Sequence, residues 1–204
     1  MPSETLLGVD EKTLLHWYLN SARTALLWKL EGLSEYDVRR PLTPTGTNLL
    51  GLVKHAAGVE LNYFGRVFDR PFPEPPRWST AEALPASDMY ADVDESRESV
   101  VAFYERVREF ADATIAAVPL DGPGLVSWWS EGRREVTLRH VLVQVSIELH
   151  RHAGHADVVR ELIDGAVGMQ DGNSNMPPVE PSWWAGHHAR LEEIAAASSR
   201  ALQG

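Results

Sequence analysis

Three histidines and a glutamate lie close together in residues 147–157, a segment that is otherwise typical of a helix. At about 100° per residue, Glu148, His152 and His155 fall within roughly 60° of one another on one helix face. Apolar residues of the same helix continue that face: Val141, Val145 and Val159. Buried polar groups cost free energy unless they are paired. A shared partner, such as a cation, is therefore one explanation for this pattern.

The residue types suit a metal ion. Imidazole nitrogens and carboxylate oxygens are the usual non-sulfur zinc ligands, and a catalytic zinc site takes three of them and leaves one position open. Glu148 and His152 are four residues apart, so their side chains can converge on one ion. His55 lies in an apolar segment, and it is the best candidate for a third ligand from a facing helix. From the residues alone two alternatives stay open, because His55 could be a hydrogen-bonded core histidine and Glu148–His152 a pair on a solvated face.

The other histidines are expected to have different positions and roles. His155 is either a ligand, a hydrogen-bond partner of a ligand or a general acid and base. His150 points about 160° away from Glu148 around the helix, which predicts a surface position. Surface positions or ordinary paired roles are also expected for the remaining histidines: His16, His140, His187 and His188.

The composition bounds the class of protein. The chain has 204 residues, of which 44% are hydrophobic, and this is enough for one domain with a sizeable core. A formal net charge of −10 disfavours nucleic acid as a partner. The sequence has no cysteine, so a thiol used in chemistry would have to come from another molecule. The first residues are not typical of a signal peptide, and no apolar run is long enough for a membrane span; we expect a cytoplasmic protein.

Helical periodicity dominates the chain. Helices are predicted from Asp10 to Gly32, from Thr47 or Asn48 to Phe68, from Asp92 or Asp94 to Pro119, from Thr137 to Gly165, and from Pro181 to Arg200. The proline-rich segment 70–76 and the Gly- and Asn-rich segment 166–180 are predicted to be loops. No segment alternates long enough to require a sheet. We predict an all-α fold, a four-helix bundle with long crossover loops and an additional C-terminal helix, as a single domain over 1–204 with its bundle core at about 10–165.

Two motifs resemble those of a known family. Residues 48–60 resemble the second helix of DinB-like proteins, where a histidine follows an apolar helix start. Glu148-x-x-x-His152-Ala153-Gly154-His155 resembles the family's second motif, commonly His-x-x-x-His-x-Gly-Gln. Further strings are similar to an actinobacterial subgroup of unknown function: Phe68–Pro73, Trp128–Trp129, Arg151–Asp157 and Trp183–Trp184.

This resemblance implies a four-helix bundle that binds a divalent metal through His55, Glu148 and His152. Zinc is the expected ion, with nickel and manganese as alternatives. Glu148 stands where many members have histidine, and mycothiol-dependent maleylpyruvate isomerase also has a glutamate there. His155 replaces the common glutamine. We assign His155 a catalytic role, in which it orients a ligand or moves a proton.

Characterised relatives implied by the resemblance are thiol-dependent enzymes, including mycothiol-dependent isomerases and transferases. We therefore expect a metalloenzyme that uses mycothiol as a thiol cosubstrate with an electrophilic small-molecule substrate. The alternatives are a non-catalytic metal-binding stress or scaffold protein and a metal-dependent hydrolase.

Further polar and aromatic residues could contribute to the site. An anionic substrate could meet one of four arginines, although surface charges are the simpler interpretation: Arg39, Arg40, Arg66 and Arg70. The tryptophan pairs 128–129 and 183–184 either line the pocket or, as we expect, pack at the ends of the bundle and contribute to a homodimer contact.

Overall fold

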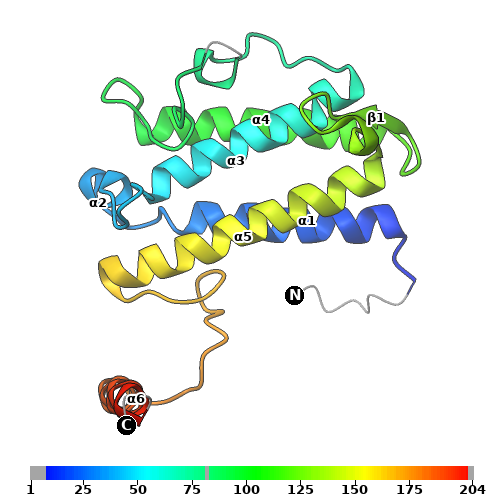
Figure 1. The fold of residues 1–204 in the computed structure, drawn as a ribbon. Coiled ribbons are helices and arrows are strands. Elements are labelled where there is room, and N and C mark those ends of the chain that lie inside the picture. The colour runs from blue at the N-terminus through cyan, green and yellow to red at the C-terminus, as the bar shows by residue number, and fades with distance from the viewer. Residues whose placement is uncertain (1–7, 81–82, 202–204) are drawn as a thin grey trace. The chain divides into compact units, whose positions relative to one another are not determined.

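Four long helices build the core of the computed structural model, which describes residues 8–80 and 83–201. They are α1 (Glu11–Trp28), α3 (Leu49–Phe64), α4 (Arg97–Ala117) and α5 (Leu138–Asp164). Helix α3 packs against α4 and α5, and α1 packs against α5 (Figure 1). The predicted all-α bundle is confirmed.

The four helices form two parallel pairs. Glu11 and Arg139 pair at the starts of α1 and α5, and Arg160 near the end of α5 donates to the Lys29 carbonyl just after α1, so α1 and α5 run in the same direction. Figure 1 shows α3 and α4 running in the opposite direction. Because α3 and α4 are parallel and consecutive, the chain must return along the bundle between them. Residues 65–96 make that long crossover, and it passes beside the candidate site described below.

Helix α3 is the most buried helix of the bundle. Its sequence is apolar almost all round, as expected for a helix that packs on several sides. Even its two charged residues, Lys54 and Glu60, are buried. A side chain on α3 is therefore held by neighbours on most faces, which favours this helix as the support for a precise site.

A buried ion pair joins α1 and α3 in the core. Nε of Arg23 donates to both carboxylate oxygens of Glu60 at 3.0 and 3.1 Å, and Tyr104 on α4 donates its hydroxyl to Glu60 at 2.9 Å. Burial favours neutral Arg23, but the charge of Glu60 outweighs it and raises the pKa of Arg23 above its usual value. Burial and the same carboxylate raise the pKa of Tyr104 well above its usual range. Arg23 also reaches Asp112, 2.6 Å away, so the pair is part of a wider network.

Three predicted helix starts agree with the structure. Asp10, Asn48 and Thr137 are the N-caps of α1, α3 and α5, and each side chain accepts a hydrogen bond from a backbone N–H three residues later. Helix α5 ends where predicted, because Gly165 adopts a left-handed conformation with φ of 78°.

Three predicted boundaries were wrong. The helix predicted to start at Asp92 or Asp94 begins at Arg97 with Ser96 as N-cap, because the Glu95 carboxylate pairs with Lys54 and holds residues 92–95 in a turn on α3. The helix predicted to reach Phe68 ends at Phe64. At Gly65 a Cβ would lie 2.4 Å from the Leu61 carbonyl, and a short 3-10 turn, η1 (Arg66–Phe68), follows. Similarly, α1 ends at Trp28, four residues before Gly32.

The sequence did not predict several short elements. They are the helix α2 (Glu35–Arg39), the 3-10 turns η2 (Arg77–Ser79) and η3 (Glu131–Arg133), and the antiparallel strands β1 (Pro123–Leu125) and β2 (Glu135–Thr137). The expectation of no sheet is corrected by this two-stranded hairpin. Three residues per strand are too few to show an alternating pattern.

The chain divides into two compact units, one up to Ser174 and one from Asn175. The second unit contains α6 (Pro181–Ala201), close to the C-terminal helix predicted from the sequence. The single domain over 1–204 stays a prediction. The N-terminal segment, which the sequence indicated is not a signal peptide, lies largely outside the described residues. Among the helices of residues 8–80 and 83–201, none is long and apolar enough to cross a membrane.

Candidate metal centre

Helices α3 and α5 bring three candidate ligands together. His55, Glu148 and His152 each offer one ligand atom, and these atoms lie within 4.8 Å of one another. Nε2 of His152 is 3.0 Å and Nε2 of His55 is 3.8 Å from the same oxygen of Glu148. Ligand atoms about 2.1 Å from a tetrahedral zinc ion lie about 3.4 Å apart. Two imidazoles and a carboxylate at this spacing fit a divalent ion after small side-chain movements.

His152 is the most enclosed of the three, with 6% of its surface exposed. Burial, followed by the neighbouring His55, lowers the pKa of His152 below its usual 6.5. The neutral imidazole, which is the form that binds metals, is thus favoured. Its Nδ1 is buried without a hydrogen-bond partner among the described residues.

The crossover between α3 and α4 adds a residue that the sequence did not indicate. One carboxylate oxygen of Asp88 lies 2.7 Å from Nδ1 of His55. This hydrogen bond is the largest cause that lowers the pKa of Asp88 below its usual value. Asp88 lies in a loop, where no periodic spacing links it to the histidine motifs, so only the folded structure reveals the contact.

His155 lies beside the cluster and is not part of it. Its ring centre is 5.4 Å from that of His152, one turn earlier on α5, and the side chain is exposed. His150 is exposed, as predicted, and its Nδ1 donates to the Ser146 carbonyl at 2.7 Å. His140 is exposed against Trp129, and His16 pairs with Asp112 at 2.8 Å. In the C-terminal unit, His187 stacks on Trp183 and His188 is exposed.

A hollow of about 330 Å³ opens beside His55. Its lining includes His55, Asp88 and three aromatic side chains: Tyr63, Trp78 and Trp128. Trp128 contacts Tyr63 edge to face, with ring centres 5.3 Å apart. Trp128 therefore lines this hollow, whereas Trp129 packs against the hydrophobic core.

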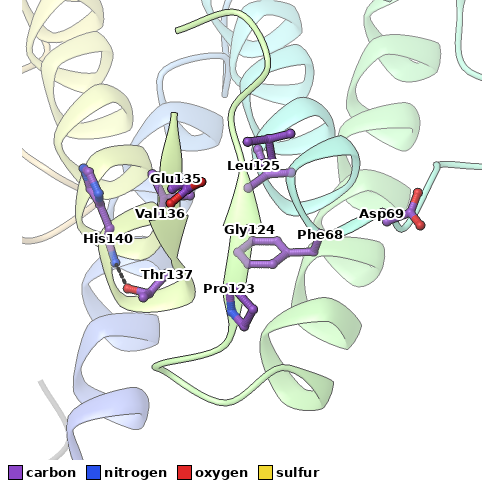
Figure 2. Close-up of a pocket in the computed structure, with 10 residues that line it drawn as sticks. Phe68, Asp69, Pro123, Gly124, Leu125, Glu135, Val136, Thr137 and His140 are labelled. Atoms are coloured by element: carbon purple, nitrogen blue, oxygen red, sulfur yellow. Dashed lines mark hydrogen bonds between the residues drawn. The ribbon is translucent and has the colours of Figure 1, made fainter. Parts of the chain in front are cut away.

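A larger hollow lies elsewhere. Its volume is about 740 Å³, and Figure 2 shows it between β1, β2 and the start of α5, with His140 and Glu135 on one side and Phe68 on the other. It contains none of the three candidate ligands. It is also widely open to solvent, so size alone does not make it the reaction site.

The four candidate arginines have partners of their own. Arg39 and Arg40 pair with Glu35 and Asp37, each at 3.0 Å, and Arg70 donates to the hydroxyl of Thr114. Arg66 donates to the Ser79 carbonyl at 2.9 Å and lines the hollow beside His55. Only Arg66 among the four lies where a ligand in that hollow could reach it.

Comparisons with known proteins agree with this geometry. A crystal structure of a conserved protein from Enterococcus faecalis has a TM-score of 0.61 and 13% sequence identity, and the match covers 78% of this chain and all of that one. At this identity it shows the fold alone. No curated protein matches the chain. The family model of mycothiol-S-transferase matches residues 14–165, which contain all four bundle helices except the start of α1, and the three candidate ligands. The chain therefore belongs to the mycothiol S-transferase family of DinB-like proteins.

Proposed function

We propose that this protein is a divalent-metal-dependent enzyme that transfers a low-molecular-weight thiol, mycothiol, to an electrophilic substrate or uses it to isomerise one. The observation that carries the proposal is the convergence of His55, Glu148 and His152 within 4.8 Å, in a chain of the mycothiol S-transferase family. A metal-activated thiol also suits a chain without cysteine.

The three side chains would hold the metal from α3 and α5. Zinc is the expected ion for two imidazoles and one carboxylate, and nickel or manganese could replace it, because such ligands accept several ions. A divalent ion with an open coordination position lowers the pKa of a thiol and supplies a thiolate at neutral pH.

Residues of the chain would accept the proton and bind the electrophile. His155 is exposed one turn beyond His152. We therefore propose that its imidazole accepts the proton that the thiol releases. The electrophile would occupy the hollow beside His55, with an apolar part against Trp128 and Tyr63. Its 330 Å³ suits a small molecule. Arg66 at the edge of this hollow would favour substrates that carry a negative charge.

The proposal includes a cytoplasmic location, because low-molecular-weight thiols are kept reduced there. It also keeps small molecules as the partners, in agreement with the acidic charge of −10. We also propose a homodimer, with the tryptophan pairs contributing to its contact.

Turnover with a defined electrophile tests the function. Purified protein, reconstituted with zinc, is mixed with mycothiol and monochlorobimane, and the thioether is followed by fluorescence and mass spectrometry. We expect faster conjugation than in the uncatalysed mixture, with glutathione and free cysteine as comparison thiols. Trp128→Ala should raise KM for the electrophile and leave zinc binding unchanged.

Other results would favour the alternatives. Stoichiometric zinc without conjugation, with any thiol tested, would support a non-catalytic metal-binding protein. Hydrolysis of ester or amide substrates without added thiol would support the hydrolase. A protein that binds no divalent ion after reconstitution would contradict all three metal-dependent functions.

A further inference from the structure

The carboxylate of Asp88 determines how the ring of His55 can act. Oδ2 of Asp88 and Nδ1 of His55 are 2.7 Å apart. An ionised carboxylate only accepts hydrogen bonds, so Nδ1 carries the hydrogen. In the neutral imidazole the other nitrogen, Nε2, then keeps its lone pair. That nitrogen faces the cluster, 3.8 Å from Glu148.

The loop that carries Asp88 is fastened to α3 by its neighbours. The carbonyl of Met89 accepts a hydrogen bond from the Asn48 side chain at 3.1 Å. The carbonyl of Tyr90 accepts one from Nζ of Lys54 at 3.0 Å, and the same ammonium pairs with Glu95 at 2.6 Å. The two residues that follow Asp88 are therefore hydrogen-bonded to α3, one of them to the buried Lys54, which directly precedes His55 in the sequence.

Close backbone packing supports the same loop. A Cβ at Gly51 would lie 1.8 Å from the Met89 carbonyl oxygen, so only glycine allows the loop to approach α3 this closely. Gly51 lies one helical turn before His55 on α3. The loop and the histidine are therefore positioned by the same stretch of helix.

The two histidines of the cluster differ in this respect. Nδ1 of His55 has the Asp88 carboxylate, whereas Nδ1 of His152 has no hydrogen-bond partner among the described residues. Ligand histidines in metal sites commonly donate their second N–H to a carboxylate, which fixes the ring and its tautomer. Only His55 has that arrangement here.

We propose that Asp88 is a positioning residue, which holds His55 with its Nε2 directed at the metal. This inference rests on the proposed metal-dependent function, and it adds a residue that neither the histidine motifs nor the family match assigns. Asp88 is not one of the three groups whose ligand atoms converge. It acts through the orientation and tautomer of His55.

Zinc affinity of the full chain tests the inference. The variants are Asp88→Ala, Asp88→Asn and, as a matched control, Asp94→Ala, which removes one exposed acidic residue of the same connection. Affinity is measured by competition with a chelator. We expect Asp88→Ala to bind zinc about 10- to 100-fold more weakly. Asp88→Asn keeps an accepting oxygen and should lose less, and Asp94→Ala should match the unmodified protein.

A second readout separates positioning from folding. Nitrogen-15 NMR of the metal-free protein reports which ring nitrogen of His55 carries the hydrogen. We expect Nδ1–H in the unmodified protein and in Asp88→Asn, and a mixture of tautomers in Asp88→Ala at an unchanged melting temperature. If Asp88→Ala binds zinc as tightly as Asp94→Ala, the inference is overturned while the metal site stands. If the unmodified protein binds no zinc, the proposed function itself fails.

Discussion

Nε2 of His152 lies 3.0 Å from Oε1 of Glu148, one turn earlier on α5, and the same oxygen lies 3.8 Å from Nε2 of His55 on α3. One carboxylate oxygen therefore faces two imidazoles from two helices. In a metal-free protein this oxygen accepts a hydrogen bond from Nε2 of His152, and with an ion present all three groups would become ligands. This shared geometry leads to the first prediction.

Removal of a ligand should abolish metal-dependent stabilisation. Metal at a hundredfold excess over Kd stabilises a protein by about 2.7 kcal/mol. We expect this gain in the unmodified protein and its loss in His152→Ala and Glu148→Gln. His150→Ala is the control, because His150 is exposed and bonds only to the Ser146 carbonyl. Zinc-dependent melting and bound metal content are measured together; equal zinc content in His152→Ala and His150→Ala would refute the assignment.

The stability of the metal-free protein should depend on the protonation of His152. Its pKa is lowered by burial from 6.5, so below about pH 6.5 the unfolded chain binds a proton that the folded chain resists. Stability is therefore complete above pH 6.5 and falls as the pH decreases through this window. Urea unfolding at pH 7.5 and 5.5 should show a larger loss for the unmodified protein than for His152→Gln. A loss of equal size in the two proteins would contradict this origin.

The buried pair of Arg23 and Glu60 makes a prediction about the core. Both side chains are fully buried, and Glu60 also accepts from Tyr104. Arg23→Met leaves the Glu60 charge unpaired and should destabilise the protein by about 3–5 kcal/mol. The double variant Arg23→Met/Glu60→Leu removes both charges and should recover much of that loss. Urea unfolding of the unmodified protein, Arg23→Met, Glu60→Leu and the double variant measures these losses. Losses of the two single variants that simply add in the double variant would show that the pair is not coupled.

Glycines at two positions should respond in opposite ways to alanine. Gly51→Ala places a Cβ 1.8 Å from the Met89 carbonyl and must displace the crossover, at a cost of about 1–3 kcal/mol. Gly154 on α5 has no atom within 4 Å of an added Cβ, so Gly154→Ala should stabilise the helix by about 0.5–1 kcal/mol. Thermal unfolding of both variants provides the comparison. A neutral Gly51→Ala would show that the loop does not rest on α3.

The crossover also links stability to the candidate site. If Gly51→Ala moves residues 88 and 89 away from α3, the contact between Asp88 and His55 should weaken. Zinc affinity should then fall in Gly51→Ala and stay unchanged in Gly154→Ala. This outcome would separate an effect on the site from an effect on helix stability alone.

Local chemistry made much of the fold predictable. The N-caps Asp10, Asn48 and Thr137 and the left-handed Gly165 act within a few residues, so the sequence alone marked these helix ends. The start of α4 could not be predicted in this way. The helix begins only at Arg97, because Glu95 pairs with Lys54, about forty residues earlier in the sequence.

The sequence by itself determined the bundle class and, through helical spacing, that Glu148 and His152 share a face of α5. Spacing could not join His55 to them, and the family resemblance supplied that third residue before the structure placed it 3.8 Å from Glu148. Only the tertiary structure revealed Asp88 and the hollow walled by Trp128. The physical reason is that periodicity reports contacts within one helix, whereas these residues lie in connections whose path depends on packing against α3.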